Sequence, residues 1–465
     1  MRKMRKLTTI LLMMAMVLSL GACGSSKNSD NQNADSNNTN SNGDSTSTDQ
    51  VAGGKDVDVY VLQYKIEIND ALQKAIDKYE ELYPNVHIEL ESVGGNDSVD
   101  TLYKAKAASG QMPDIFNCAG PESCETYADY LEDLSDQPWV EHANSGMLDL
   151  DKIGDAIYGM PVTTEGMGLI VNKAMFEAAG IDISTLDSYD KIEAAFKQLQ
   201  KAIDAGDLKK DFPNLQNVTS VQGGATWVLG NHAINVALSP EFKEDVFACA
   251  NADTVNFDYK DAYVAYTELQ LNYSDAKDNW AKSLKVDYNA AVQEQLATGK
   301  VACIQQGNWI YGDVKKIDET TADNLAFIPA PIKGYKEDSI FSIVSNYWCV
   351  NKQSDDDVKE AAKHFLNWLY QSDEGKEIVV NDFGFTPVFD NYGDLQPSDN
   401  LTKSMLEFFS NNKGIPMVFQ GAPDGEDYTM NVFGAKVQGV FANKLSWDEC
   451  FKQSATEWAE RRASK

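Results

Sequence analysis

The sequence predicts an α/β protein made of two lobes with a cleft between them. About 410 residues follow residue 54, which is too many for one ordinary hydrophobic core. Residues 57–116 alternate strand and helix patterns in the order β-α-β-α-β, the unit of a parallel sheet. The stretch 158–173 carries polar residues and glycines between two long α/β runs. We expect the chain to pass there from one lobe to the other, outside either interior.

The first 22 residues have the pattern of a secretory signal. Four basic residues lie among the first six positions, and an apolar run from residue 7 to residue 20 follows, shorter than a membrane-spanning helix. The run ends in Leu-Gly-Ala before Cys23, which resembles a bacterial lipobox, although a chance cysteine after an ordinary signal is the alternative. We expect residues 1–22 to be removed and Cys23 to be acylated, anchoring the chain to a membrane.

Residues 23–54 are predicted to form a lipidated, disordered tether. From residue 24 the segment consists almost entirely of Ser, Asn, Asp, Gly and Thr, with no large apolar residue before Val51. Such a composition buries too little surface to offset the entropy lost on ordering. The folded body should therefore stand away from the membrane surface.

The composition is strongly acidic. Once the four basic residues of the signal are removed, 36 basic and 71 acidic residues remain, a net charge of −35. This charge excludes binding to nucleic acid or anionic lipid through a general electrostatic field. It is compatible with a neutral or cationic ligand, although solubility alone would also account for it.

Six cysteines remain after Cys23, and we expect them to be buried free thiols. They are scattered singly in apolar contexts, at positions 118, 124, 249, 303, 349 and 450. The nearest pair, Cys118 and Cys124, could instead form a disulfide across a loop. No Cys-x-x-Cys occurs and the four histidines lie far apart, so we expect neither a metal site nor a cofactor.

The predicted elements of the first half begin with a strand over 57–62. A helix with apolar positions between 68 and 82 ends before Pro84, and a strand follows over 86–93. Next come a helix over 98–109 and a strand opening at 113–116. In such a unit the ligand edge lies at the carboxyl ends of the strands, here the loops 63–67 and 117–122.

The remaining elements alternate less regularly. The expected helices and strands are, in order, a helix over 189–205, a loop over 222–227 leading into 228–238, helices over 261–272 and 289–298, a strand over 300–305, an extended piece over 326–331, a strand over 341–350, helices over 358–370 and 374–381, a break at 383–387, and helices over 401–458 around a Gly/Pro loop at 421–425.

Three motifs occur in an order that resembles a known family. They are the first-half pattern with Tyr-Pro at 83–84, Ser-Gly-Gln-Met-Pro-Asp-Ile-Phe at 109–116 and residues 129–134, the stretch 158–181, and residues 297–309. Together they resemble the extracellular solute-binding proteins of bacterial carbohydrate ABC importers (family 1), which are lipoproteins. The resemblance spans roughly residues 55–460.

This resemblance implies a periplasmic-binding-protein-like type II fold, with two discontinuous α/β lobes around a hinge and a ligand cleft. The chain would cross between the lobes near 163–166, 336–342 and 381–387. The N-terminal lobe would comprise 55–163 plus 343–380, and the C-terminal lobe 164–342 plus 381–465. Such a hinge allows closure around a ligand.

Three tryptophans are candidate ligand contacts, because an aromatic face suits the apolar C–H face of a sugar. Trp309 follows the polar Asn308 in a turn at a strand end and matches a sugar-stacking aromatic of the resembled family. Trp227 follows Gln222 and two glycines, and Trp348 alternates with an adjacent tyrosine. Core packing or a simple surface turn is the alternative for each.

Polar candidates, which include Gln222 and Asn308, complete the expected site. Glu165 lies in the crossing, where its carboxylate could accept bonds from vicinal hydroxyls or form a hinge salt bridge. Asn117 and Glu122 lie on a carboxyl-end loop, and Tyr64 on the first such loop. Family members often have an aromatic and an acid in this loop, whereas residues 117–122 read Asn-Cys-Ala-Gly-Pro-Glu, and this departure leaves the substrate open. Tyr428 lies where the family supplies a late aromatic.

We found no catalytic constellation, and acidic pairs arise by chance among 71 acidic residues. We therefore expect no enzyme but a monomeric substrate-binding lipoprotein at the outer face of the cytoplasmic membrane. It would capture a sugar, most simply an oligosaccharide, by hinge closure and deliver it to ABC permease subunits. The alternatives are a surface glycan-degrading enzyme or a binder of another solute, such as a peptide or polyamine.

Overall fold

The computed structural model describes residues 50–94 and 99–464. The predicted signal, Cys23 and the tether up to residue 49 lie outside the described residues. The tether was expected to extend to residue 54, but Val51–Gly54 form a short 3-10 helix in which Val51 and Ala52 are buried in the core that also contains β1. In the described part of the chain, no helix combines the length and apolar character needed to cross a bilayer. Two sheets, each with its own hydrophobic core, organise residues 50–464.

The first sheet has five strands in the order β2, β1, β3, β12, β6. Their bounds are β1 (Val57–Gln63), β2 (Val86–Ser92), β3 (Ile115–Cys118), β6 (Met160–Pro161) and β12 (Tyr347–Val350). Strand β1 runs parallel to β2 and β3, whereas β12 is antiparallel to β3 and β6. Helices α1 (Asn69–Leu82) and α2 (Val99–Ala108) connect the parallel strands. The predicted β-α-β-α-β unit is therefore confirmed.

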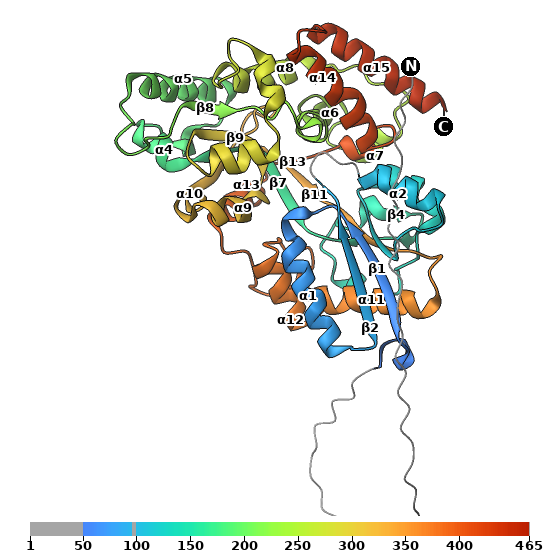
Figure 1. The fold of residues 1–465 in the computed structure, drawn as a ribbon. Coiled ribbons are helices and arrows are strands. Elements are labelled where there is room, and N and C mark those ends of the chain that lie inside the picture. The colour runs from blue at the N-terminus through green and yellow to red at the C-terminus, as the bar shows by residue number, and fades with distance from the viewer. Residues whose placement is uncertain (1–49, 95–98, 465) are drawn as a thin grey trace, which may run out of the picture. The chain divides into compact units, whose positions relative to one another are not determined.

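Amphipathic helices cover this sheet. On α1 the buried residues Leu72, Ala75, Ile76 and Tyr79 recur at three- and four-residue spacing, which turns one face of the helix to the strands. Helix α11 (Asp356–Gln371) packs beside β1 (Figure 1). A hydrogen bond between Tyr79 and His364 also joins α11 to α1. We call this sheet with its helices the first lobe.

The second sheet is built around β7 (Thr164–Asn172). Its strand order is β13, β11, β7, β9, β8, with β10 also paired to β7. The other bounds are β8 (Asn217–Ser220), β9 (Val301–Gly307), β10 (Leu325–Ile328), β11 (Ile340–Val344) and β13 (Gly414–Pro416). We call this sheet with the helices around it the second lobe.

Residues 164–172 were expected to lie outside both interiors, and this expectation is wrong. All but the first residue of β7 are buried, because its residues 166–171 are apolar or glycine and two hydrophobic cores cover its two faces. The chain passes between the sheets at Val162-Thr163, just after β6. A single strand over 341–350 is also wrong, since β11 and β12 belong to different sheets and Ser345-Asn346 separate them.

The third passage between the lobes was expected near 381–387. Buried residues up to Tyr392, including Phe383, Phe385 and Phe389, pack in the core of the first lobe. Helix α13 (Asn400–Ser410) packs instead on β10 of the second sheet. We propose that this passage lies between residues 392 and 400.

The remaining helices and a short hairpin complete the fold. Their bounds are β4 (Lys152–Ile153), β5 (Ala156–Ile157), α3 (Pro121–Thr126), α4 (Lys173–Ala178), α5 (Tyr189–Ala205), α6 (Asn235–Glu241), α7 (Val246–Ala250), α8 (Lys260–Asn272), α9 (Ile310–Ile317), α10 (Glu319–Asp323), α12 (Asp373–Glu377), α14 (Ala435–Phe441) and α15 (Trp447–Ser464). Four segments are π-helical: η7 (Val228–His232), η9 (Ala290–Leu296), η10 (Ile378–Asp382) and η13 (Tyr428–Gly434).

All six described cysteines are buried free thiols, as expected. Cys124 donates to the carboxylate of Asp151 at 3.0 Å, and the Cys349 sulfur lies 3.6 Å from the other oxygen of the same carboxylate. Burial, with a contribution from Cys118, raises the pKa of Asp151 well above its usual range. These side chains lie in the interior of the first lobe.

Candidate functional site

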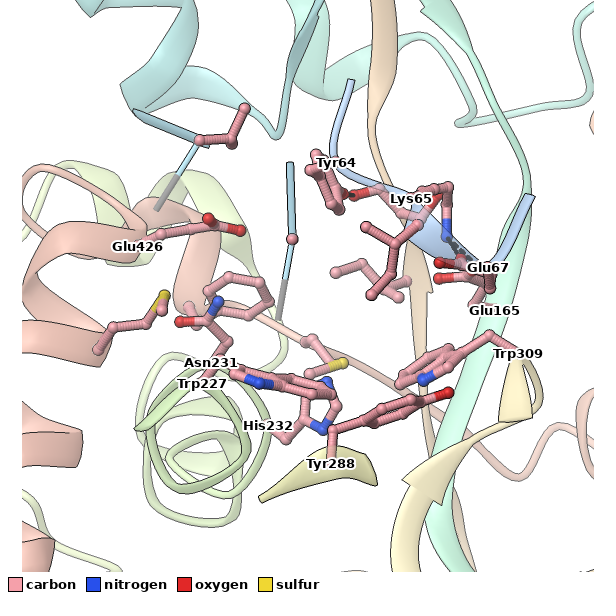
Figure 2. Close-up of a pocket in the computed structure, with 18 residues that line it drawn as sticks. Tyr64, Lys65, Glu67, Glu165, Trp227, Asn231, His232, Tyr288, Trp309 and Glu426 are labelled. Atoms are coloured by element: carbon pink, nitrogen blue, oxygen red, sulfur yellow. Dashed lines mark hydrogen bonds and ion pairs between the residues drawn. The ribbon is translucent and has the colours of Figure 1, made fainter. Parts of the chain in front are cut away.

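A cavity of about 180 Å³ lies between the loop after β1 and the second lobe. Four residues singled out in the sequence meet there: Tyr64 from the first lobe, Glu165 from β7, and Trp227 and Trp309 from the second lobe. Figure 2 shows the rings of Trp227, His232, Tyr288 and Trp309 gathered on one side of the cavity, and Tyr64, Lys65, Glu67 and Glu165 on another. The cavity thus presents apolar ring faces and charged groups to one space.

Four rings form the aromatic side of the cavity (Figure 2). The His232 ring centroid lies 4.9 Å from that of Trp227 and 5.3 Å from that of Trp309. Tyr288 lies 6.0 Å from Trp227, and its hydroxyl donates to Asp313 at 2.9 Å. Such spacings are typical of favourable aromatic contacts, so the rings support one another in place.

A glycine makes room for Trp309. A Cβ at Gly307, the last residue of β9, would lie 1.9 Å from the Trp309 ring, so only glycine lets the ring fold back over the strand end. Asn308 fixes the same turn, since its Oδ1 accepts from the backbone N–H of Gly166 at 3.0 Å. Asn308 itself is buried and does not line the cavity.

Trp227 and His232 are positioned by the close packing of η7 on η13. A Cβ at Gly230 would lie 2.0 Å from the carbonyl oxygen of Thr429, and one at Gly434 would lie 2.5 Å from that of Thr226. The two π-helical segments therefore approach each other through glycine on each side. π-Helical turns are frequent at functional sites. Here η7 directs the rings of Trp227 and His232 into the cavity (Figure 2).

The charged side of the cavity centres on Lys65. Its Nζ lies 2.6 Å from Glu165 and 3.0 Å from Glu67, and all three side chains are largely buried. Burial disfavours the ammonium form, but the two carboxylates outweigh it and raise the pKa of Lys65. Burial also raises the pKa of Glu165, opposed by Lys65 and reinforced by Glu67. The Lys65 ammonium therefore forms ion pairs with both Glu67 and Glu165.

Polar groups without a hydrogen-bond partner among the described residues also line the cavity. They include Trp227 Nε1 and His232 Nδ1. Burial lowers the pKa of His232 to about 3, so the ring is neutral. The carboxylate of Glu426 points into the cavity (Figure 2), and burial together with Asp100 raises its pKa to about 7. Unpaired polar groups of this kind are suited to a ligand that supplies the missing partners.

Asn117 and Glu122 lie in an adjoining depression that shares Tyr64 and Glu426 with the cavity. The Asn117 amide donates to the Tyr347 carbonyl at 3.3 Å. Glu122 is buried and accepts from Arg462 of α15 at 2.7 Å, which joins the first lobe to the second. The structure therefore gives the carboxylate of Glu122 a protein partner.

Three further candidates lie outside the cavity and have protein partners. Gln222 donates to the Gln305 carbonyl at 3.0 Å. Trp348 is buried in the core of the first lobe, where its Nε1 donates to Tyr370 at 3.1 Å. Tyr428 is fully buried, and its hydroxyl donates to the Ser454 carbonyl at 2.8 Å. The structure thus follows the core-packing alternative for Trp348.

Four of the lining residues carry no recognisable signal in the sequence. Lys65 lies in the predicted carboxyl-end loop 63–67, but a lone lysine there has no pattern of its own. Asn231, His232 and Tyr288 lie in or beside π-helical segments that periodicity does not reveal. Among the described residues, no three His, Cys, Asp or Glu side chains form a group suited to a metal ion.

Two sheet-centred lobes are joined by short passages, and a cavity lies between them. In this architecture a hinge at the passages can let the lobes close around a ligand. Residues 74–405, well over half of the chain, match the family described as bacterial extracellular solute-binding protein. The chain therefore belongs to this family.

Two relatives align with part of the chain. The xylose/arabinose-binding protein of Haloferax volcanii is 25% identical over 301 residues, covering 59% of this chain and 59% of that protein. The multiple sugar-binding protein of Streptococcus mutans is 21% identical over 271 residues, covering 56% of this chain and 60% of that protein. The alignments thus span less than two-thirds of either relative.

A maltose-bound protein from T. maritima has a similar structure, with a TM-score of 0.68 and 15% sequence identity. The match covers 86% of this chain and 99% of that one. At this identity the similarity establishes the fold. The predicted periplasmic-binding-protein-like α/β class, with two sheet-containing lobes, is therefore confirmed.

Proposed function

We propose that this chain is the substrate-binding lipoprotein of an ABC importer and captures a sugar, most simply an oligosaccharide, by closing its lobes. The observation that carries the proposal is the pairing of four aromatic rings with the Lys65, Glu67 and Glu165 group around one cavity. Membership of the solute-binding family and the sugar-binding names of two relatives support it.

The chemistry of the two sides suits a sugar. The C–H faces of a pyranose ring pack on Trp227 and Trp309, which exclude water without needing hydrogen bonds. Each carboxylate that binds Lys65 has a second oxygen, and these oxygens accept charge-assisted hydrogen bonds from sugar hydroxyls. Carboxylates that are already ordered by Lys65 lose little further conformational freedom when the ligand arrives.

The passages between the lobes supply the hinge. Glu165 lies at the start of β7, two residues beyond the passage at 162–163, and Ser345 lies in the second passage. A small rotation about these connections would separate the loop after β1 from the aromatic rings and open the cavity. Closure would bury the sugar between the two lobes.

In the cell, we propose, acylated Cys23 holds the protein at the outer face of the cytoplasmic membrane, and the closed form docks as a monomer on permease subunits. The sugar is delivered unchanged. A glycan-degrading enzyme would instead produce new reducing ends during incubation, which a reducing-sugar assay detects.

Titration calorimetry of residues 50–465 against a panel of mono- and oligosaccharides tests the proposal. For Trp309→Ala we expect at least a tenfold loss of affinity for any sugar that binds, about 1.4 kcal/mol, with the fold intact by circular dichroism. Tyr335→Ala removes an exposed aromatic of the same lobe and should leave affinity unchanged. No binding across the panel would overturn the proposal.

A further inference from the structure

The cavity carries more acid than base. Lys65 is the only lysine or arginine among its described lining residues, and Glu67 and Glu165 already share it. Glu426 adds a third carboxylate on another side. The single histidine, His232, is neutral because burial lowers its pKa to about 3. With all carboxylates ionised, the lining therefore has a net charge of −2.

Glu426 has no cation of its own. Its carboxylate makes no hydrogen bond or ion pair within the described residues, and the charged or titratable groups that act on it are Asp100 and Tyr64. The Tyr64 hydroxyl already donates to the Ser345 carbonyl at 2.9 Å. Asp100 lies 2.7 Å from Lys104, so that nearby ammonium is engaged as well. A part-buried carboxylate in this setting lacks a positive partner.

The aromatic side of the cavity also lacks a positively charged partner. The π faces of Trp227, Trp309 and Tyr288 carry negative potential, which attracts cations as well as C–H groups. His232 is only 7% exposed, and its Nδ1 has no partner among the described residues. A neutral imidazole nitrogen can accept a hydrogen bond from an ammonium or a hydroxyl group. The ring faces therefore favour a ligand that carries positive charge, and a His232 nitrogen that accepts favours one that donates hydrogen bonds.

We propose that the cavity selects an amino sugar, a sugar with a free protonated amine, whose ammonium group lies against Glu426 beside the aromatic rings. This inference rests on the proposed function, because it names the kind of sugar that the cavity takes. The ammonium supplies the charge that Glu426 lacks, and the sugar ring supplies the C–H face for the tryptophans. Uronic acids and sulfated sugars are excluded, because they would place a further negative charge beside three carboxylates.

The test compares two disaccharides that differ at the nitrogen alone: one of two glucosamine units and its N-acetylated counterpart. Titration calorimetry at pH 7 on residues 50–465 should show the amine form binding at least tenfold more tightly. Glu426→Gln keeps the size of the side chain and removes its charge. It should weaken binding of the amine form at least tenfold and change binding of the acetylated form less than threefold.

Glu294→Gln is the matched control, since Glu294 is an exposed acid of the same lobe outside the cavity. It should change neither affinity. Proton release provides a readout on the unmutated protein, should the Glu426→Gln variant fail to fold. At pH 6, amine binding should release a large fraction of one proton as Glu426 ionises, whereas binding of the acetylated form should release none.

Equal or tighter binding of the acetylated disaccharide would overturn the amino-sugar inference and leave the proposed sugar-binding function standing. So would an unchanged amine preference in the Glu426→Gln variant, or the absence of proton release. Failure of every sugar to bind would remove the proposed function itself, and the inference with it.

Discussion

Two buried contacts between acidic and basic side chains connect the lobes. They differ in how much hydrogen-bonding capacity remains for a ligand. Arg462 donates to Glu122 and also to the carbonyls of Ala252, Cys249 and Gly421, so its donors are used within the protein. Lys65 instead serves two acids beside an open space. The first contact is suited to holding the lobes, and the second keeps acceptor capacity for a ligand.

The largest effect is expected from breaking the contact between Arg462 and Glu122, and it should fall on the stability of the fold. Arg462→Met removes the partner of a buried carboxylate and three further hydrogen bonds, so we expect the free energy of unfolding to fall by about 3–5 kcal/mol. Urea denaturation followed by circular dichroism measures the change. Arg461→Met is the matched control: Arg461 is more exposed and its partners lie in the same lobe, so its loss should be about 1 kcal/mol or less. Equal losses would contradict the comparison.

The next effect concerns the second contact and should fall on affinity. Glu165→Gln keeps the shape of the side chain but removes the charge that strengthens its hydrogen bonds, so ligand affinity should drop by about 1.5–3 kcal/mol. Stability should change less, because Lys65 keeps Glu67. Calorimetry and thermal unfolding on the same sample separate the two effects.

Glu67→Gln serves as the matched comparison for Glu165. Its contact with Lys65 is longer and its side chain is more exposed, so we expect a smaller loss of affinity. A larger loss for Glu67→Gln than for Glu165→Gln would show that the loop after β1, and not β7, makes the main contact with the ligand.

The smallest effect concerns pH. The pKa of Glu426 is about 7 in the folded protein, above the ordinary 4.5, so the folded state binds the proton more tightly than the unfolded state. The favourable contribution is complete below about pH 4.5 and is lost as the pH rises to about 7. Glu426→Gln should therefore be about 1–2 kcal/mol more stable than the unmodified chain at pH 8 and equally stable at pH 4. A stability difference independent of pH would contradict the raised pKa.

Local sequence patterns predicted the first lobe well. The spacing of Leu72, Ala75, Ile76 and Tyr79 is a property of α1 alone, and strands β1 to β3 follow each other along the chain. Tyr64, Glu165, Trp227 and Trp309 were found in the sequence because loops at strand ends and turns rich in glycine carry recognisable signals.

The features of the fold and of the site that the sequence did not predict depend on contacts between segments far apart in the chain. Residues 164–172 read as a passage because their polar start and glycines conceal a strand whose neighbours come from residues 301–307 and 340–344. Glu122 looked like a free acid, since its partner Arg462 lies 340 residues further on. Trp348 and Tyr428 were equally ambiguous, because an aromatic residue has the same local pattern in a core and at a cavity.

The six buried thiols have a practical consequence. A maleimide dye reacts with accessible cysteines, and the described body offers it none of its native ones. Lys74 on α1 and Lys201 on α5 are exposed and lie in different lobes, so cysteines placed there would be labelled selectively. Fluorescence energy transfer between the two dyes could then follow single molecules as they open and close, without first removing any of the cysteines of the folded body.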